Sequence, residues 1–352
     1  MTEPVAPAER NLPRLTSLRA FAAFGVLVFH LQFWTGWSVT EVLGVDGSAG
    51  VAFFFILSGF VLTWSMRPGT SAWAFYRRRF ARVYPNHFVT AVAALVVPVT
   101  VLAIEGQALV LNFALIHTWV PRNDWVYSLN GVSWSLACEA FFYASFPVLL
   151  FVMRRLPTRQ VLAASSAWVL GTMLITLFGA SQGGRTALLV DVNPLLRSGE
   201  FVLGIATALL MSRGWRPQWS LTGSCLTLIV ALTVTRFLDL PYPAANALLI
   251  LPLWAVLAAA ASSDLKKLPG WLPNRIFVYL GELSFAFYLV HELVIINTLH
   301  VFGWRNPVPD MQELGLMQGA GFAVVAILLA TFLAAVLHHV VELPCQRALL
   351  AR

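Results

Sequence analysis

The sequence has 352 residues, of which 59% are apolar and 11% are charged, and it contains 13 tryptophans. This composition excludes a soluble protein of such length, so we expect a polytopic membrane protein. A formal net charge of +7 is also found in nucleic-acid-binding proteins. Here, however, the basic residues lie in short clusters between apolar runs, which is typical of membrane topology signals and argues against a nucleic-acid partner.

Apolar runs of about 20 residues, the length that a helix needs to cross a bilayer, recur along the chain. The sequence does not show the alternating ten-residue segments that are typical of a membrane β-barrel. We therefore predict an all-α polytopic bundle of about ten transmembrane helices, the first of which is retained rather than cleaved as a signal peptide. The predicted spans are approximately 15–34, 48–66, 84–104, 134–153, 161–180, 195–212, 219–236, 244–262, 276–299 and 316–340.

An even number of spans places both termini on the same side of the membrane. If that side is the cytoplasm, all but five of the 23 Lys and Arg residues fall near it, as the positive-inside rule requires. We therefore expect a cytoplasmic tail (1–14), a transmembrane domain (15–340) and a short cytoplasmic tail (341–352). The five exceptions are Arg122, Arg185, Arg197, Arg236 and Arg305.

The longest outward loop, about 105–133, contains an apolar piece from Ala108 to Trp119 that is too short to span a bilayer. We predict a helix that lies at the interface or re-enters the bundle. Neither a metal site nor a disulfide framework is expected, because the cysteines have no spacing typical of either. They are Cys138, Cys225 and Cys345.

The first span contains two polar residues, Arg19 and His30, that are expensive to place in hydrocarbon. They lie about 16 Å apart along a helix and within about 20° of the same face. We expect both to border one hydrated cavity that opens toward the cytoplasm. An alternative stays open for this pair alone, in which Arg19 reaches the headgroups and His30 bonds to a neighbouring helix.

A basic cluster lies between the second and third spans. On a helix, Arg79 and Arg82 share a face at a spacing of three residues, and Arg78 and Arg82 share one at a spacing of four. Guanidinium groups bind phosphates through paired hydrogen bonds, so a cytoplasmic phosphorylated ligand is a natural partner. For any single arginine, anchoring to anionic lipid is the better explanation of the charge. Four arginines within six residues, however, exceed what membrane orientation requires.

The fourth span carries Glu139 about five residues from its outer end, on the face that also presents Ser135 and Tyr143. A carboxylate at that depth needs a partner. Pairing with Arg19 or Arg197 is as reasonable for Glu139 as acid–base chemistry.

The ninth span presents Ser284, Tyr288 and His291 along one stripe, which suggests a wall of the same cavity or a polar seam between helices. In the second span, Ser58 lacks the flanking residues of a nucleophile elbow, and the Ser58-Gly59 pair is expected to allow close helix packing. His87 either faces a cavity or is a packed donor. Glu342 is expected to mark the end of the last helix.

Taken together, these pieces resemble the membrane acyltransferase 3 family, and their order covers nearly the whole chain. The resemblance is carried by Arg19-x10-His30, Phe53-Phe54-Phe55-Ile56-Leu57-Ser58-Gly59-Phe60, Arg79-x-x-Arg82, Trp134-Ser135-Leu136 with Glu139, and Leu283-Ser284 leading to Tyr288 and His291.

The resemblance implies a ten-helix bundle that moves an acyl group, often acetyl, from cytoplasmic coenzyme A to a hydroxyl of a carbohydrate or similar acceptor. It implies that His30 is the essential catalytic residue, that Arg19 belongs to its site and that Arg79 and Arg82 serve the donor. Some members of the family also have an extracytoplasmic hydrolase-like domain, which this chain is expected to lack.

We predict that His30 acts as general base, with Arg19 and Glu139 as further catalytic residues. Acyl-CoA is expected as a donor substrate bound by Arg78, Arg79 and Arg82, with no permanently bound cofactor. Further substrate contacts are predicted at Trp134, Tyr143, Ser284, Tyr288 and His291.

A transporter or flippase is the alternative class, because it would also place polar groups at mid-membrane. The chain shows no corresponding halves, and transport gives no reason for the arginine cluster to accompany the His30 helix. The expected location is a bacterial inner membrane, and the acceptor and the oligomeric state are left open.

Overall fold

The computed structural model describes residues 11–37, 49–96, 105–303 and 314–351, and these residues form helices joined by turns, with no strand among them. The long helices are α1 (Pro13–Thr35), α3 (Ala49–Ser65), α4 (Ala72–Val96), α7 (Trp134–Arg155), α8 (Thr158–Gln182), α10 (Ser198–Ser212), α11 (Leu221–Phe237), α12 (Tyr242–Leu265), α13 (Arg275–Val301) and α14 (Leu316–Val336). The short ones are α5 (Gly106–Phe113), η2 (His117–Trp119), α6 (Asn123–Val126), η3 (Gly131–Ser133), α9 (Gly184–Val192), η4 (Leu337–Glu342) and α15 (Leu343–Leu350).

The all-helical class is confirmed, and within the described residues six helices are long and apolar enough to cross a membrane. Helices α3, α10 and α11 are apolar but shorter. The third predicted span, 84–104, belongs to α4, which begins twelve residues earlier and carries the arginine cluster on the same helix; residues 97–104 lie outside the described part. The total of ten spans stays a prediction, as does the tail 1–14, of which residues 1–10 are not described.

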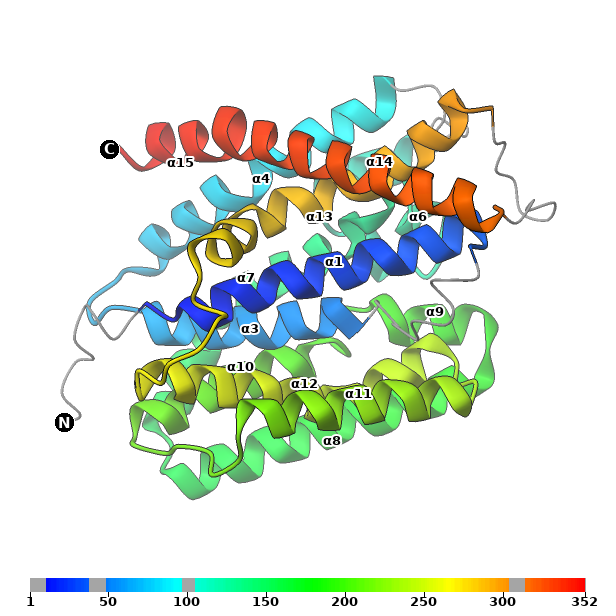
Figure 1. Cartoon of the computed structure of the whole chain (residues 1–352). Helices are drawn as coiled ribbons and strands as arrows, with labels where there is room; N and C mark the ends of the chain where they lie inside the picture. The colour runs from blue at the N-terminus through cyan, green and yellow to red at the C-terminus, as the bar shows by residue number, and fades with distance from the viewer. Residues whose placement is uncertain (1–10, 38–48, 97–104, 304–313, 352) are drawn as a thin grey trace.

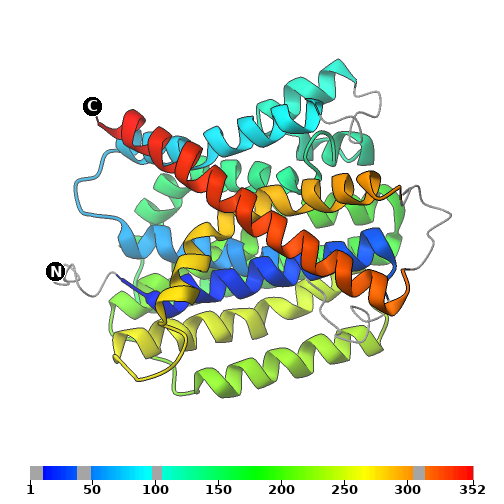
Figure 2. The same cartoon turned by 45° about the horizontal axis from the view of Figure 1, so that its top comes forward.

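Helices α1 and α13 occupy the middle of the bundle, between α4, α14 and α15 on one side and α8, α11 and α12 on the other (Figure 1). Helix α1 begins and α15 ends at the same end of the bundle in both views (Figures 1 and 2). At that end Arg14 anchors α1 to α12, because its backbone amide and its guanidinium both donate to the Asp264 carboxylate, at 2.9 and 2.7 Å.

Close packing of α3 on α10 depends on two glycines. A Cβ at Gly59 would overlap the backbone oxygen of Phe201, and a Cβ at Gly204 would overlap that of Ile56. Side chains are therefore excluded where the two backbones meet, as at other small-residue contacts between membrane helices. The predicted packing role of the Ser58-Gly59 pair is confirmed.

The described part of the connection between α4 and α7, residues 105–133, folds back onto the bundle. Its apolar piece forms α5 and η2 and no span, in agreement with the prediction. Inside it, the Asn112 side chain donates to the backbone oxygen of Ser128 at 2.8 Å, while the Asn112 carbonyl lies 3.1 Å from Nε2 of the fully buried His87. His87 is thus a packed partner of this loop, one of the two roles expected for it.

The last helix does not end at Glu342, which corrects that expectation. A single turn of π-helix, η4, carries the chain from α14 into α15, and Pro344 follows in α15. The last helical segments therefore form one continuous rod, coloured orange to red in Figure 2. Pro344 lies in the first turn of α15, where a proline's missing N–H costs least. Glu342 is buried, and its carboxylate oxygens lie near Asn86 at 3.2 Å and His338 at 3.0 Å.

Candidate active site

A cavity of about 260 Å³ lies among α1, α3, α4, α7 and α13. Along α3 its wall extends from Val51 to Ser65, which is about 21 Å of helix. Val61 and Ser65 are exposed, so the cavity opens at the end of the bundle where α3 leads into α4. Its polar lining consists of Arg19, Ser58, Ser65, Arg79, Arg82, Ser135, Glu139, Tyr143, Ser284 and Tyr288.

Three arginines line this cavity, and they come from two helices distant in sequence. Arg19 belongs to α1, and Arg79 and Arg82 belong to α4 at the predicted spacing. The three side chains are half-buried. Guanidinium groups retain their charge, so three of them in one hollow favour an anionic ligand. One ion-pair partner of Arg82 is the buried Glu342, at 3.9 Å, a residue to which the sequence analysis gave no role in the site.

The carboxylate of Glu139 is the one acidic group in the lining. Its Oε2 accepts a hydrogen bond of 2.6 Å from the Tyr143 hydroxyl one turn along α7. The alternative of a pairing with Arg197 is not what the structure shows, because Arg197 lies 3.1 Å from Glu200 and 3.8 Å from Asp191. Glu139 therefore lies inside the cavity, whose lining also contains Arg19, Arg79 and Arg82.

The predicted site residues fall into two groups. Arg19, Arg79, Arg82, Glu139, Tyr143, Ser284 and Tyr288 line the cavity, whereas His30, Arg78, Trp134 and His291 do not. The Trp134 ring packs behind the wall, 6.3 Å from the ring of Phe55, with the Arg197 guanidinium 5.9 Å away. The expectation that Arg19 and His30 border one cavity is thus corrected: Arg19 lines this one and His30 does not.

His30 lies behind one wall of the cavity, in a second cluster of polar residues. Its Nδ1 is 3.2 Å from Nε2 of His291, and the His291 ring lies 5.7 Å from the ring of the cavity residue Tyr288. The Tyr288 hydroxyl in turn donates to the backbone oxygen of Val132 at 3.1 Å. Tyr288 and His291 thus form the connection between the cavity and His30.

Glu292 is a further member of this cluster that the sequence analysis missed. Its Oε1 lies 3.7 Å from Nε2 of His30 and accepts a hydrogen bond of 3.2 Å from Nε1 of Trp34. A signal was present, because an acidic residue in an apolar span is a functional candidate by default. We name His30, Trp34, His291 and Glu292 the His30 cluster.

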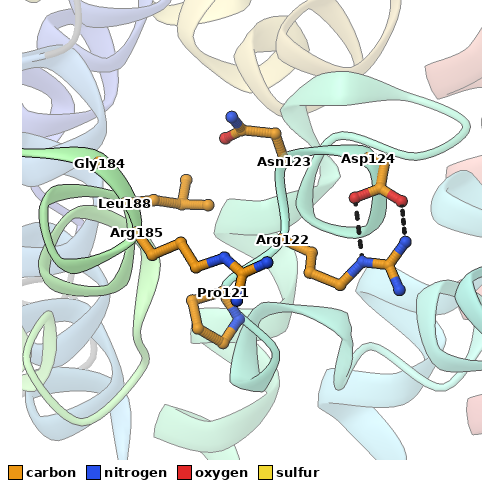
Figure 3. Close-up of a pocket in the computed structure, with 7 residues that line it drawn as sticks. All are labelled: Pro121, Arg122, Asn123, Asp124, Gly184, Arg185 and Leu188. Atoms are coloured by element: carbon orange, nitrogen blue, oxygen red, sulfur yellow. Dashed lines mark hydrogen bonds and ion pairs between the residues drawn. The ribbon is translucent and has the colours of Figure 1, made fainter.

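A second and larger hollow, of about 540 Å³, lies between α6 and α9. Arg185 extends from α9 toward Pro121, while the Arg122 guanidinium turns to Asp124 (Figure 3). Arg122 also donates to Glu105 at 2.8 Å, and these hydrogen bonds lower the pKa of Asp124 and raise that of Arg122. All three charged side chains are solvent-exposed, so this ion-pair network does not mark a desolvated reaction site.

Comparison with known proteins identifies the chemistry of this bundle. A family model described as an acyltransferase domain (Acyl_transf_3) matches residues 12–339. The chain belongs to the acyltransferase 3 family. This acyltransferase is 35% identical over 367 residues to the acyltransferase MdmB of Streptomyces mycarofaciens, with 97% of this chain and 94% of that protein covered.

The chain is also similar to two more distant relatives with different names. Nodulation protein 10 of Rhizobium leguminosarum biovar viciae is 28% identical, with 82% of this chain and 83% of that protein covered. The putative peptidoglycan O-acetyltransferase YrhL of Bacillus subtilis is 26% identical; the match covers 96% of this chain and 55% of YrhL. No solved structure matches the chain. The protein is thus a multi-pass membrane acyltransferase, which confirms the predicted family and enzyme class.

Proposed function

We propose that this acyltransferase moves an acyl group, most simply acetyl, from cytoplasmic acyl-CoA to a hydroxyl of a carbohydrate or glycan, with His30 as general base. The observation that carries the proposal is the cavity that leads from an open end lined by three arginines to Tyr288, next to the His30 cluster. A CoA thioester has this same order of parts, with anionic phosphates at one end and the acyl group at the other.

Arg79 and Arg82 are the proposed phosphate ligands. Both line the cavity on α4, and a guanidinium binds phosphate oxygens in a bidentate manner. Arg78 is next to them in sequence but outside the lining, so we propose a weaker contact for it at the mouth. The wall of α3, about 21 Å long, suits an extended pantetheine arm.

Arg19 is proposed to act on the donor rather than on the reacting hydroxyl. It lies in the cavity, and about 16 Å of helix separates it from His30, too far for a direct effect on a proton held there. Glu139 offsets part of the arginine charge and holds the Tyr143 hydroxyl. We therefore propose that both residues position the donor, with Ser284 and Tyr288 beside its acyl end.

In the proposed reaction, the acceptor hydroxyl attacks the thioester carbonyl while neutral His30 removes its proton. A C–O bond forms, the C–S bond breaks, and the proton finally resides on the thiol of free coenzyme A. Because Tyr288 and His291 lie between the cavity and His30, the acyl end must pass beside these two rings.

A glycan acceptor is supported by the name of one relative, YrhL, which is a putative peptidoglycan O-acetyltransferase. Transfer of an acetyl group to an oxygen atom is supported by the name of a second relative, the O-acetyltransferase OatA of Staphylococcus aureus. It is 27% identical, and the match covers 52% of this chain and 33% of OatA. We propose the bacterial inner membrane as the location, with the arginine-lined end of the bundle in the cytoplasm, because that orientation satisfies the positive-inside rule.

The test is release of free thiol from acetyl-CoA by the purified protein in detergent, with a panel of soluble glycans and muropeptides as acceptors. We expect acceptor-dependent thiol release by the wild type and a loss of about 10²- to 10⁴-fold in His30→Ala. Turnover that survives His30→Ala would refute the general base. Absence of thiol release with every acceptor and acyl chain length would refute acyl-CoA as donor.

A further inference from the structure

We propose that Glu292 is a positioning residue that acts through His30: it stabilises the positive charge that the ring acquires when it accepts a proton. This inference rests on the proposed role of His30 as general base. It concerns a residue that the family resemblance and the relatives' names leave unassigned.

The hydrogen bonds around His30 determine which ring nitrogen is the base. Nδ1 of His30 lies 2.9 Å from the Val26 backbone oxygen, which can only accept, so Nδ1 carries the hydrogen. Nδ1 of His291 lies 2.7 Å from the Tyr288 backbone oxygen and carries a hydrogen for the same reason. Nε2 of His291 then has no hydrogen and can accept one from Nδ1 of His30, which lies 3.2 Å away.

Both assignments leave Nε2 of neutral His30 with a free lone pair, and this is the nitrogen that faces Glu292 at 3.7 Å. A proton taken up there creates an imidazolium beside a carboxylate. Among the described residues, the titratable groups in contact with the His30 ring are His291 and Glu292, both on α13. Glu292 is therefore the group that offsets the new charge.

The structure also holds Glu292 in place. The Trp34 indole donates to Oε1, and a Cβ at Gly131 would lie 2.6 Å from Oε2. Next to Gly131, the Asn130 side chain donates to the backbone oxygen of Leu289 at 2.8 Å, which ties the end of the outer loop to α13. Oε2 is buried and has no hydrogen-bond partner among the described residues. A carboxylate left partly unsatisfied interacts more strongly with a cation formed beside it.

The proposed step is balanced without any further reactant. The acceptor O–H bond breaks, its proton moves to Nε2 of His30, and the oxygen bonds to the acyl carbon. The carbon–sulfur bond then breaks, and the imidazolium returns the proton to the departing thiolate. Glu292 remains a carboxylate throughout and exchanges no proton.

The test compares steady-state kinetics of Glu292→Gln and Glu292→Asp with those of the wild type, using acetyl-CoA and the acceptor found to be active. Glutamine keeps an acceptor for Trp34 and removes the charge. We expect kcat to fall about 10- to 100-fold in Glu292→Gln with the KM for acetyl-CoA unchanged, because Glu292 does not line the donor cavity. Glu292→Asp should recover part of that loss. Glu282→Gln is the matched control, because Glu282 is exposed on the same helix.

A double-variant cycle separates this role from a purely structural one. If Glu292 acts through His30, adding Glu292→Gln to His30→Ala should cause no further loss, since the partner is already absent. Additive losses, or a rise in donor KM, would overturn the inference. So would full activity of Glu292→Gln beside an inactive His30→Ala, a result that leaves the proposed function intact. An active His30→Ala would overturn both.

If Glu292→Gln fails to fold, Gly131→Ala provides the same test without changing a charge. The added methyl group would displace the carboxylate from its position, so kcat is expected to fall while the KM for acetyl-CoA stays constant. Wild-type kcat in a folded Gly131→Ala protein would overturn the inference, because the position of Glu292 would then have no effect on catalysis.

Discussion

Two hollows among the described residues, one between α6 and α9 and one among α1, α3, α4, α7 and α13, both contain arginines and carboxylates, yet they differ in the property that matters for catalysis. The outer one is larger, about 540 Å³, but its Arg122, Asp124 and Glu105 are exposed to solvent. The inner one has about 260 Å³ and is lined by residues from five helices. Its charged side chains are half-buried, whereas Asp124 and Glu105 of the outer hollow are more than half exposed. Partly desolvated charges interact more strongly with a bound ligand, so volume alone does not identify an active site.

The sharpest test of this comparison is removal of the inner arginines. We expect Arg79→Ala combined with Arg82→Ala to raise the KM for acetyl-CoA about 100-fold or more, because two charge-assisted phosphate contacts are lost. The measurement is thiol release as a function of acetyl-CoA concentration. Among the single variants, Arg78→Ala is the matched control and should raise the KM less than Arg79→Ala or Arg82→Ala does, since Arg78 is outside the lining. An equal rise in all three single variants would contradict the distinction.

A second prediction concerns the wall that shapes the inner cavity. Gly204→Ala should destabilise the protein by about 1–3 kcal/mol, because its Cβ would meet the backbone of α3. The control is Gly171→Ala in α8, where a Cβ meets nothing within 4 Å and where alanine should be neutral or stabilising. Thermal unfolding in detergent compares them, and equal melting temperatures would show that α3 and α10 tolerate separation.

The smallest effects are expected in the outer hollow. Arg122→Ala and Arg185→Ala should leave the KM for acetyl-CoA unchanged, and a large increase would mean that the donor enters from that side.

The Arg122 hydrogen bonds lower the pKa of Asp124 below its ordinary 3.8. The contribution of this ion pair to stability is therefore present at neutral pH and is lost only as pH falls through that lowered value. Because the pair is exposed, Asp124→Asn should hardly change the melting temperature at pH 7.

Part of the candidate active site could be predicted from local patterns. Arg79 and Arg82 lie three residues apart on one helix, and both line the cavity as expected. Ser284 and Tyr288 were expected on one stripe of α13, and they also line it. In each case helical periodicity alone determines which side chains share a face.

The rest depended on contacts between distant segments. Trp34 and Glu292 are 258 positions apart, and His30 and His291 are 261 apart, so no local pattern connects them. The π-helical turn that carries Glu342 toward Arg82 was also not predicted, because a proline such as Pro344 usually indicates the end of a helix.

The sequence by itself determined that this protein is a helical membrane protein, because apolar length and helical periodicity are properties of single segments. Its motifs also resembled the acyltransferase 3 family, and the family model confirmed that membership. Only the tertiary structure decided that Arg19 joins the inner cavity while His30 stands behind Tyr288 with Glu292 as its partner. The physical reason is that these relationships depend on how α1, α4, α7 and α13 pack together. That packing follows from close contacts, such as Gly281 against the backbone of Thr16, which are made across the whole chain.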